Sequence, residues 1–173
     1  MTQTKLRDLV IAPVGEAFLL LIAALAGWVS HQPLIFASLG PTAYELVEMP
    51  HRRSAQPRSV LIGHLVAVVS GFAALFIAGC WQAPPVSTAG VPFPRIWAAV
   101  VAAGLTVFIN LLLRASQPAA LSTALLVALG IMQSPRDAAI LMGGVVPMLV
   151  FGEPIRLWRL RHQQQVQEKG LEA

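Results

Sequence analysis

The sequence predicts an all-α integral membrane protein, a bundle of helices that crosses a bilayer several times. Hydrophobic residues make up 56% of the chain and charged residues only 12%, whereas a soluble domain carries about 25% charged residues. The mean hydropathy is +0.69. The basic residues lie between and beyond the apolar runs, where they orient a membrane protein. The net charge of +4 therefore does not indicate nucleic-acid binding.

Six apolar segments form one transmembrane domain over residues 1–158, which a polar cytoplasmic tail follows over residues 159–173. The segments cover residues 11–30, 33–49, 59–81, 96–113, 118–132 and 138–158. A spanning helix needs about 20 residues, so the second and fifth segments are short. Residues 82–94 are too rich in Pro and Gly for a membrane helix. Pro13 and Glu16 interrupt the first run, which we interpret as a retained helix rather than a signal peptide.

The positions of the basic residues favour six crossings of a bacterial inner membrane, with both termini in the cytoplasm. In that arrangement ten of the 12 basic residues are cytoplasmic, and only Arg95 and Arg136 lie outside. If the second and fifth segments are re-entrant, four helices span, and seven basic residues are cytoplasmic against five outside. The positive-inside rule favours six crossings. Four spanning helices with two re-entrant segments remain the alternative.

A weak internal repeat supports the six-segment interpretation. Both halves contain a long segment, a short segment, a Pro-Arg pair and another long segment. The matching positions are Ala37, Leu39, Thr42, Ala43 and Pro57-Arg58 in the first half and Ala119, Leu121, Thr123, Ala124 and Pro135-Arg136 in the second. Because each half crosses three times, the second half would enter from the opposite side. Interrupted segments at corresponding places in two inverted halves indicate a transport site.

The breaks before the two short segments are candidate binding elements. Gly40-Pro41-Thr42 interrupts the second segment, and Ser116-Gln117-Pro118 precedes the fifth. Pro is favoured at the first position of a helix, so we expect helices to begin at Pro41 and Pro118. Their free N–H groups would face the bilayer interior, where such a helix end attracts anions. A Pro kink or an ordinary helix start at the interface is the alternative.

Several other polar residues lie in or near the apolar segments. We expect Glu45 and Glu48, which share a helix face, to form interfacial ion pairs with Arg52, Arg53 and Arg58. His64 can bind an anion, relay a proton or hydrogen-bond a neighbouring helix. Asn110 favours a hydrogen bond between helices.

A row of small residues, Gly63, Ala67 and Gly71, lies in the third segment at spacings of four. Small residues allow the backbones of two helices to approach closely. The row predicts close packing against a neighbouring helix or a second subunit. A six-helix chain of 173 residues gives a thin bundle, so we expect a homo-oligomer.

The stretch from Ala37 to His64, ASLGPTAYELVEMPHRRSAQPRSVLIGH, resembles the signature of the HPP family of integral membrane proteins. That signature combines a Gly-Pro-Thr-Ala run, an acidic turn that ends in Pro, and a Pro-Arg-x-x-x-x-Gly-His element. Gln117-Pro118-Ala119 stands where the family has its His-Pro-Pro motif, so the motif His is absent. The resemblance covers about residues 17–152. The resemblance implies four membrane spans. It also implies nitrite transport, because family members in chloroplasts and cyanobacteria are linked to that activity.

The residues and the resemblance together predict a transporter or channel-like protein for a small anion such as a nitrite-like one. The sequence has no HExxH, CxxC, P-loop or GxSxG motif, so we expect neither an enzyme nor a cofactor. The expected partners are the lipid bilayer and the anion. The predicted site consists of Gly40, Pro41, Thr42, Arg58, His64, Gln117, Pro118, Ser122 and Thr123. A membrane interaction or regulatory module without transport is the alternative, and a membrane enzyme that uses His64 and Glu45 is a third hypothesis.

Overall fold

The computed structural model describes residues 3–171, and side chains within 9–88 and 90–165. Every regular element in this part of the chain is helical. Four helices are long: α1 (Gln3–Ser30), α3 (Pro57–Ile77), α5 (Phe93–Leu112) and α7 (Pro135–Leu171). Two are short, α2 (Leu39–Glu48) and α6 (Ala120–Ala128), and two are single turns, the 3₁₀ turn η1 (Arg53–Ala55) and α4 (Val86–Ala89). The all-α prediction is confirmed.

The four long helices are the candidate membrane spans. Their apolar stretches are Leu9–Ser30, Pro57–Ile77, Phe93–Leu112 and Pro135–Gln165, each long enough for the hydrocarbon core. Large apolar side chains such as Trp28, Phe76 and Phe108 are exposed on them. A lipid-facing surface explains that exposure, because such a surface needs no water-compatible side chains. The chain is therefore a multi-pass membrane protein.

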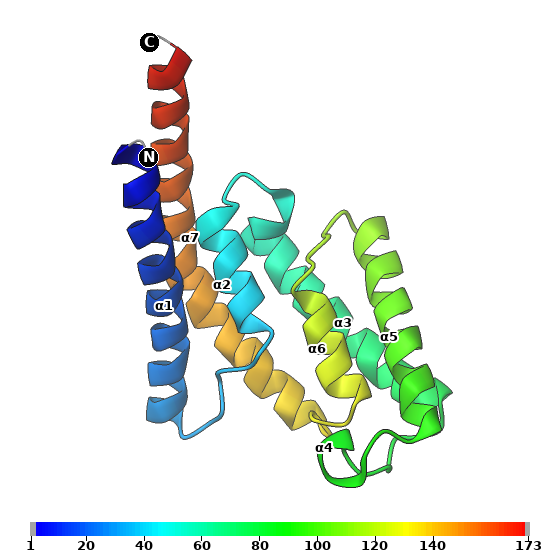
Figure 1. The fold of residues 1–173 in the computed structure, drawn as a ribbon. Coiled ribbons are helices and arrows are strands. Elements are labelled where there is room, and N and C mark those ends of the chain that lie inside the picture. Colours follow the sequence, from blue (N-terminus) through cyan, green and yellow to red (C-terminus); the bar gives the residue numbers. More distant parts are fainter. Residues whose placement is uncertain (1–2, 172–173) are drawn as a thin grey trace.

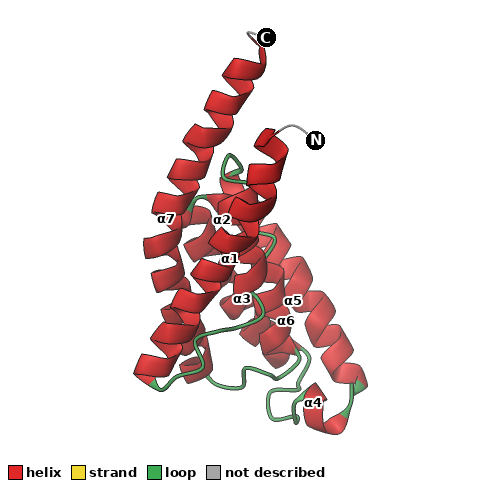
Figure 2. Ribbon diagram, turned by 60° about the vertical axis from the view of Figure 1, so that its left-hand side comes forward, coloured by secondary structure: helices red, strands yellow, loops and turns green. Residues whose placement is uncertain are grey.

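The helices form two packed groups. The first group contains α1, α2 and α7, and the second contains α3, α5 and α6; α3 also contacts α7. Figure 1 shows the first group on the left and the second on the right, with one short helix in each. We call the end of the molecule where α1 begins and α7 ends the termini end, and the opposite end the distal end. Both ends of the chain lie at the termini end in Figures 1 and 2.

The two broken segments each run alongside a long helix of their own group. The first of them starts at Leu34 beside Gly144 of α7 and rises until Val47 meets Arg159. The second starts at Gln117 beside Gly63 of α3, and its Val127 lies against Gly71. Each segment begins with an irregular stretch and a turn and then becomes helical. As a result, α2 ends at the termini end and α6 ends at the distal end (Figure 1).

The start of each short helix differs from the prediction by two residues. Helix α2 begins at Leu39, before Pro41. Helix α6 begins at Ala120, after Pro118, because residues 117–122 first form a tighter turn with bonds from each N–H to the carbonyl three residues back. Pro41 therefore lies inside the first turn, a position that also lacks an intrahelical partner for its nitrogen.

The row of small residues in α3 packs within the chain. A Cβ atom at Gly63 would lie 2.5 Å from Gln117 Cβ, and one at Gly71 would lie 2.6 Å from Val127 Cβ. Of the two sequence interpretations, the structure supports the neighbouring helix, which is α6. The glycines are required because the α6 segment approaches the α3 backbone more closely than any side chain permits. The expected homo-oligomer remains a prediction that this row does not support.

Buried arginines bind the carboxyl ends of both short helices. Arg159 of α7 donates from Nε to the Val47 carbonyl (3.0 Å) and pairs with Glu48 (3.1 Å). Arg95 at the start of α5 donates to the carbonyls of Ala128 (3.0 Å) and Ala83. A cation at the carboxyl end of a helix offsets the negative end of its dipole and satisfies its free carbonyls. The long helix α7 continues through Arg159 into the predicted tail.

Candidate functional site

His64 joins the starting turns of the two short helices. Its Nε2 atom lies 3.1 Å from Thr42 Oγ1 of α2, and its Nδ1 atom lies 2.8 Å from Thr123 Oγ1 of α6. All three side chains are buried, and His64 is 0% exposed. The sequence prediction named all three residues. The structure brings them together into what we call the His64 junction, at the point where the amino ends of α2 and α6 meet.

The hydrogen bonds of the junction have one direction. The Thr42 hydroxyl donates its single hydrogen to the Ser38 carbonyl (3.0 Å), so Thr42 Oγ1 accepts the bond from His64. Nε2 of His64 therefore carries the hydrogen, and Nδ1 of a neutral imidazole accepts from the Thr123 hydroxyl. A chain of donors thus runs from Thr123 through His64 and Thr42 to Ser38, and it connects both short helices to α3.

The backbone donors expected at the two helix starts are mostly used. In α6 the N–H groups of Ala120, Leu121 and Ser122 donate to the carbonyls of residues 117, 118 and 119. In α2 the Leu39 N–H donates to Phe36, and Pro41 has no N–H. The prediction of a row of free N–H groups facing the interior is therefore wrong for α6. The helix dipoles remain, and side chains supply the polar atoms.

Unpartnered polar atoms lie buried beside the junction. Within the described side chains, the buried atoms without a hydrogen-bond partner include Ser38 Oγ, Glu45 Oε2, Asn110 Oδ1 and both amide atoms of Gln117. Gln117 is 2% exposed and Glu45 is 6% exposed. Such groups are rare in folded proteins, and each indicates strain, function or an unseen water or ion. The cluster therefore makes this region a candidate site.

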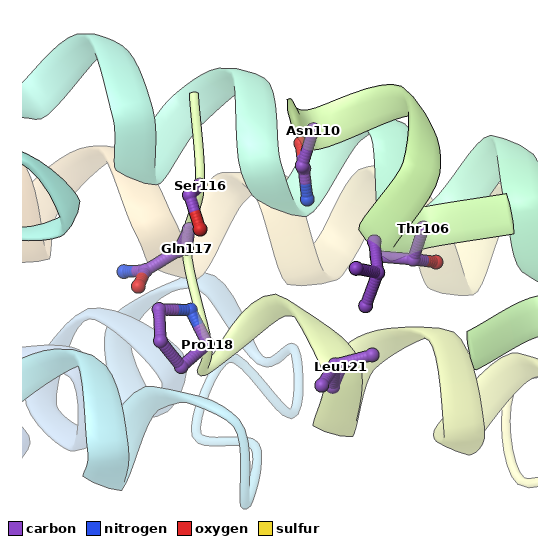
Figure 3. A pocket seen from close by; sticks show the side chains of 7 residues that line it. Thr106, Asn110, Ser116, Gln117, Pro118 and Leu121 are labelled. Carbon is purple, nitrogen blue, oxygen red and sulfur yellow. The ribbon is translucent and has the colours of Figure 1, made fainter. Parts of the chain in front are cut away.

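A cavity of about 210 Å³ opens between α5 and the start of α6. Its polar lining comes from Thr106, Asn110, Ser116 and Gln117, and its apolar lining from Val107, Pro118 and Leu121. In Figure 3 Asn110 projects between Gln117 and Thr106, and the Gln117 amide points away from both of them. The Thr106 hydroxyl donates to Ala102 (2.7 Å), whereas Asn110 Oδ1 is free. We predicted that Asn110 forms a hydrogen bond to a neighbouring helix, but its side-chain oxygen accepts none.

The carboxylates of α2 differ from the prediction. Glu48 pairs with Arg159 of α7, which is 111 residues away in the sequence. It does not pair with Arg52, Arg53 or Arg58, the arginines that follow it. Glu45 is buried and interacts with Ser54 and Gln117, with Arg52 as a more distant positive charge. The expected interfacial ion pairs with Arg52, Arg53 and Arg58 are thus replaced by a paired Glu48 and an interior Glu45.

The other predicted site residues surround the junction at greater distance. Arg58 is exposed at the start of α3, near the termini end, and His64 is fully buried, so the two do not share a site. Ser122 and Gly40 are half-buried, and Pro41 and Pro118 are exposed. The predicted transport site did not include Glu45 or Asn110, for which an interfacial ion pair and a hydrogen bond between helices were expected. The helix-end contacts of Arg95 and Arg159 were not predicted. For Arg95 a signal was present, since it directly precedes the fourth apolar segment.

Comparison with known proteins gives one match. Residues 1–153 match the protein family described as HPP, transmembrane region. No curated protein and no solved structure matches the chain significantly. The match covers nearly all of the described bundle, including both short helices and the His64 junction. The chain belongs to the HPP family of membrane proteins.

Proposed function

We propose that the protein transports a small anion, of the size and shape of nitrite, across a bacterial inner membrane. The observation that carries this proposal is the His64 junction. Two half-length helices approach it from opposite ends of the bundle, and both direct their amino ends at one buried imidazole. Discontinuous helices that meet in the middle of a bundle form the substrate sites of many transporters.

The charge distribution favours an anion. The amino end of a helix is equivalent to about half a positive charge, and two such ends face the junction. Neither α2 nor α6 has an acidic residue in its first turn. The negative ends of both helices are offset by Arg159 and Arg95. Gln117 Nε2, a donor without a partner, would then contact the solute. Thr42, His64 and Thr123 would do so when their hydrogen bonds to one another open.

The six segments form two inverted repeats on this proposal. Thr42 and Thr123 are 81 positions apart in the sequence, as are Gly63 and Gly144, and also Gly71 and Gly152. The two threonines both bond His64. Gly63 and Gly71 contact the α6 segment, and Gly144 and Gly152 contact the α2 segment. The packed pairs of helices correspond too, because α1–α7 and α2–α7 mirror α5–α3 and α6–α3.

The polar route on this proposal leads from the termini end to the junction. Ser54, Glu45 and Gln117 lie along it, and Arg52, Arg53 and Arg58 are exposed near its mouth. On the distal side of the junction, α6 presents the buried apolar side chains of Ala124, Val127 and Ala128 to its neighbours. On this proposal the described conformation is closed on the distal side. Transport would then require the second group of helices (α3, α5 and α6) to move relative to the first (α1, α2 and α7).

Anion flux into proteoliposomes tests the proposal. Vesicles that hold purified protein and an anion-sensitive dye are mixed with nitrite, nitrate, formate or chloride, and empty vesicles provide the baseline. The baseline matters because nitrous and formic acids cross lipid unaided, whereas nitrate and chloride remain ionised. We expect protein-dependent flux of nitrite and nitrate above that of chloride. A folded protein with no flux of any of the four would instead fit the membrane interaction module.

Accessibility labelling tests the proposed topology. After Cys80 is replaced by Ser, single cysteines are placed at His51 in the α2–α3 connection and at Gln82 after α3, both of which are exposed. Six crossings with cytoplasmic termini predict that an impermeant thiol reagent outside intact cells labels His51→Cys poorly and Gln82→Cys strongly. Four crossings predict the reverse, so one experiment separates the two arrangements.

Arg58 tests the proposed vestibule. The side chain is exposed near the mouth of the route, where a fixed positive charge raises the local anion concentration. We expect Arg58→Lys to keep most of the flux, and Arg58→Gln to reduce it and to flatten its dependence on ionic strength. Arg161→Gln, at an exposed position on α7, controls for the change in net charge. Equal loss in the Lys and Gln variants would instead assign Arg58 a specific guanidinium contact.

A further inference from the structure

We propose that Glu45 and Gln117 form a buried proton-binding site that couples the movement of one proton to that of each anion. The inference rests on the proposed function and adds a second transported ion to it. Two side chains carry it, one from α2 and one from the connection between α5 and α6. Both lie between the exposed arginines of the termini end and the His64 junction.

Glu45 and Gln117 are both buried, and both have polar atoms without a hydrogen-bond partner. Glu45 is 6% exposed and its Oε2 atom has no hydrogen-bond partner, while Gln117 is 2% exposed and neither of its amide atoms has one. The Glu45 carboxyl group lies near the Gln117 amide and the Ser54 hydroxyl, at a separation that leaves both Gln117 amide atoms without a hydrogen bond. Gly63 provides the space for Gln117, because a Cβ atom there would lie 2.5 Å from Gln117 Cβ. A buried carboxyl group thus lies beside a buried amide whose polar atoms have no hydrogen-bond partner.

An amide is a suitable partner for a carboxyl group that gains and loses a proton. An ionised carboxylate only accepts hydrogen bonds, and it can accept from Gln117 Nε2. A protonated carboxyl group also donates one, and Gln117 Oε1 can accept it. Rotation of the amide exchanges its two ends, so either protonation state of Glu45 finds a partner. A buried cation, by contrast, would stabilise only the ionised state.

Charged groups on the elements packed around α2 surround Glu45 and Gln117, and several of them are paired with one another or exposed. Glu48 pairs with Arg159, and Glu153 pairs with Arg156, whose Nη1 also donates to the Pro50 carbonyl. Arg52 acts on Glu45 at longer range and is exposed, as are Arg53 and Arg58. His64 lies within hydrogen-bond distance of Thr42 and Thr123. On α1, Glu16 faces the charge of Glu48 rather than Glu45.

The repeat indicates that Glu45 is specific to one half of the protein. At the spacing of 81 residues that relates Thr42 to Thr123, Glu45 corresponds to Leu126, and Gln117 corresponds to Phe36. The packing of a half-helix against a long helix is therefore possible with apolar residues at both positions. A carboxyl group and an amide in one half only are not required by the fold, which is consistent with a functional role.

The position of Glu45 explains why the proton and the anion would move together. Two like charges a few ångströms apart in a protein interior, where little water screens them, repel one another strongly. An anion next to Gln117 would meet this repulsion from an ionised Glu45, and none from a protonated one. Binding of one proton to the Glu45 carboxylate makes the pair of ions neutral. An inward proton gradient would then drive anion uptake.

Simultaneous measurement of nitrate and internal pH in proteoliposomes tests the coupling. In wild-type vesicles we expect inward nitrate flux to acidify the interior and to be unaffected by potassium and valinomycin, because no net charge moves. Glu45→Gln is expected to lose the acidification, and its remaining nitrate flux should require valinomycin to dissipate the membrane potential. Glu48→Gln is the matched control three residues away, and we expect it to retain coupling. Wild-type nitrate flux without acidification would overturn the inference and leave the proposed function intact.

Infrared difference spectroscopy tests the proton site without any flux. As the pH is raised, the purified wild-type protein is expected to lose the C=O band of a protonated carboxyl group, and to regain it when the pH is lowered again. The band should be absent from Glu45→Gln and present in Glu48→Gln. Identical spectra of wild type and Glu45→Gln would refute proton binding at Glu45. If the band titrates but no anion flux exists, the proposed function fails and coupling fails with it, while the proton site stands.

Discussion

Replacement of His64 by Phe is expected to abolish anion flux and to lower the stability of the bundle by several kcal/mol. The ring of Phe fills a similar volume but removes both polar atoms. Thr42 Oγ1 would lose the bond that it accepts, and the Thr123 hydroxyl would lose its acceptor. Each buried group left unsatisfied costs about 1–3 kcal/mol. Flux into proteoliposomes and the unfolding midpoint in detergent measure the two effects.

A second substitution separates the structural part of this effect from the transport part. Gln at position 64 offers an acceptor and a donor, so it can reproduce part of the bridge between Thr42 and Thr123. We expect His64→Gln to recover stability relative to His64→Phe, and to show altered flux because the imidazole is lost. If His64→Phe is as stable and as active as the wild type, the junction neither connects the helices nor lies on the route.

Gly71→Ala is expected to destabilise the protein by about 1–3 kcal/mol, the usual cost of overpacking a core. The added Cβ atom would lie 2.6 Å from Val127 Cβ and 3.1 Å from the Ala124 carbonyl oxygen. The Cβ atom of Val127 and the carbonyl oxygen of Ala124 cannot move by side-chain rotation. The whole of α6 must therefore shift to make room for the added atom. Chemical unfolding in detergent measures the change in free energy, and the oligomer mass should stay unchanged.

Gly104 provides the matched control for that prediction. It lies within α5, and a Cβ atom there would have no neighbour within 4 Å. Gly104→Ala should stabilise the protein by about 0.4–1 kcal/mol, because Ala loses less conformational entropy on folding than Gly does. If Gly71→Ala were instead neutral and lowered the oligomer mass, the face of α3 would contact another subunit and the internal packing would be wrong.

The sequence was sufficient to predict the class of fold and the positions of the breaks. Charge content and apolar length predicted the membrane class, and the Gly-Pro and Gln-Pro pairs located both helix starts to within two residues. The prediction could not place the helix starts precisely. At Pro118 the chain first makes a tighter turn and enters α6 at Ala120, a choice that depends on how Gln117 passes Gly63. Such a contact between distant residues leaves no local signal.

The roles of the charged residues were the least predictable part of the site. Glu45 and Glu48 share a helix face, yet one is buried beside Gln117 and the other pairs with Arg159. Which neighbour each carboxyl group meets depends on the packing of α2 against α7 and the α5–α6 connection. The roles of Arg95 and Arg159 likewise depend on backbone carbonyls that are far away in the sequence. Charge counting gives orientation but cannot identify buried arginines that bind helix ends.

The most direct test of the account is whether an anion passes between α2 and α6. A Gln117→Cys variant in a Cys80→Ser background places a thiol between Glu45 and the His64 junction. Proteoliposomes of this variant are measured for nitrate flux before and after reaction with a small thiol reagent. The account predicts flux above that of empty vesicles, its loss on modification, and slower modification when nitrate is present. Flux that is unchanged by complete modification of this cysteine would contradict it.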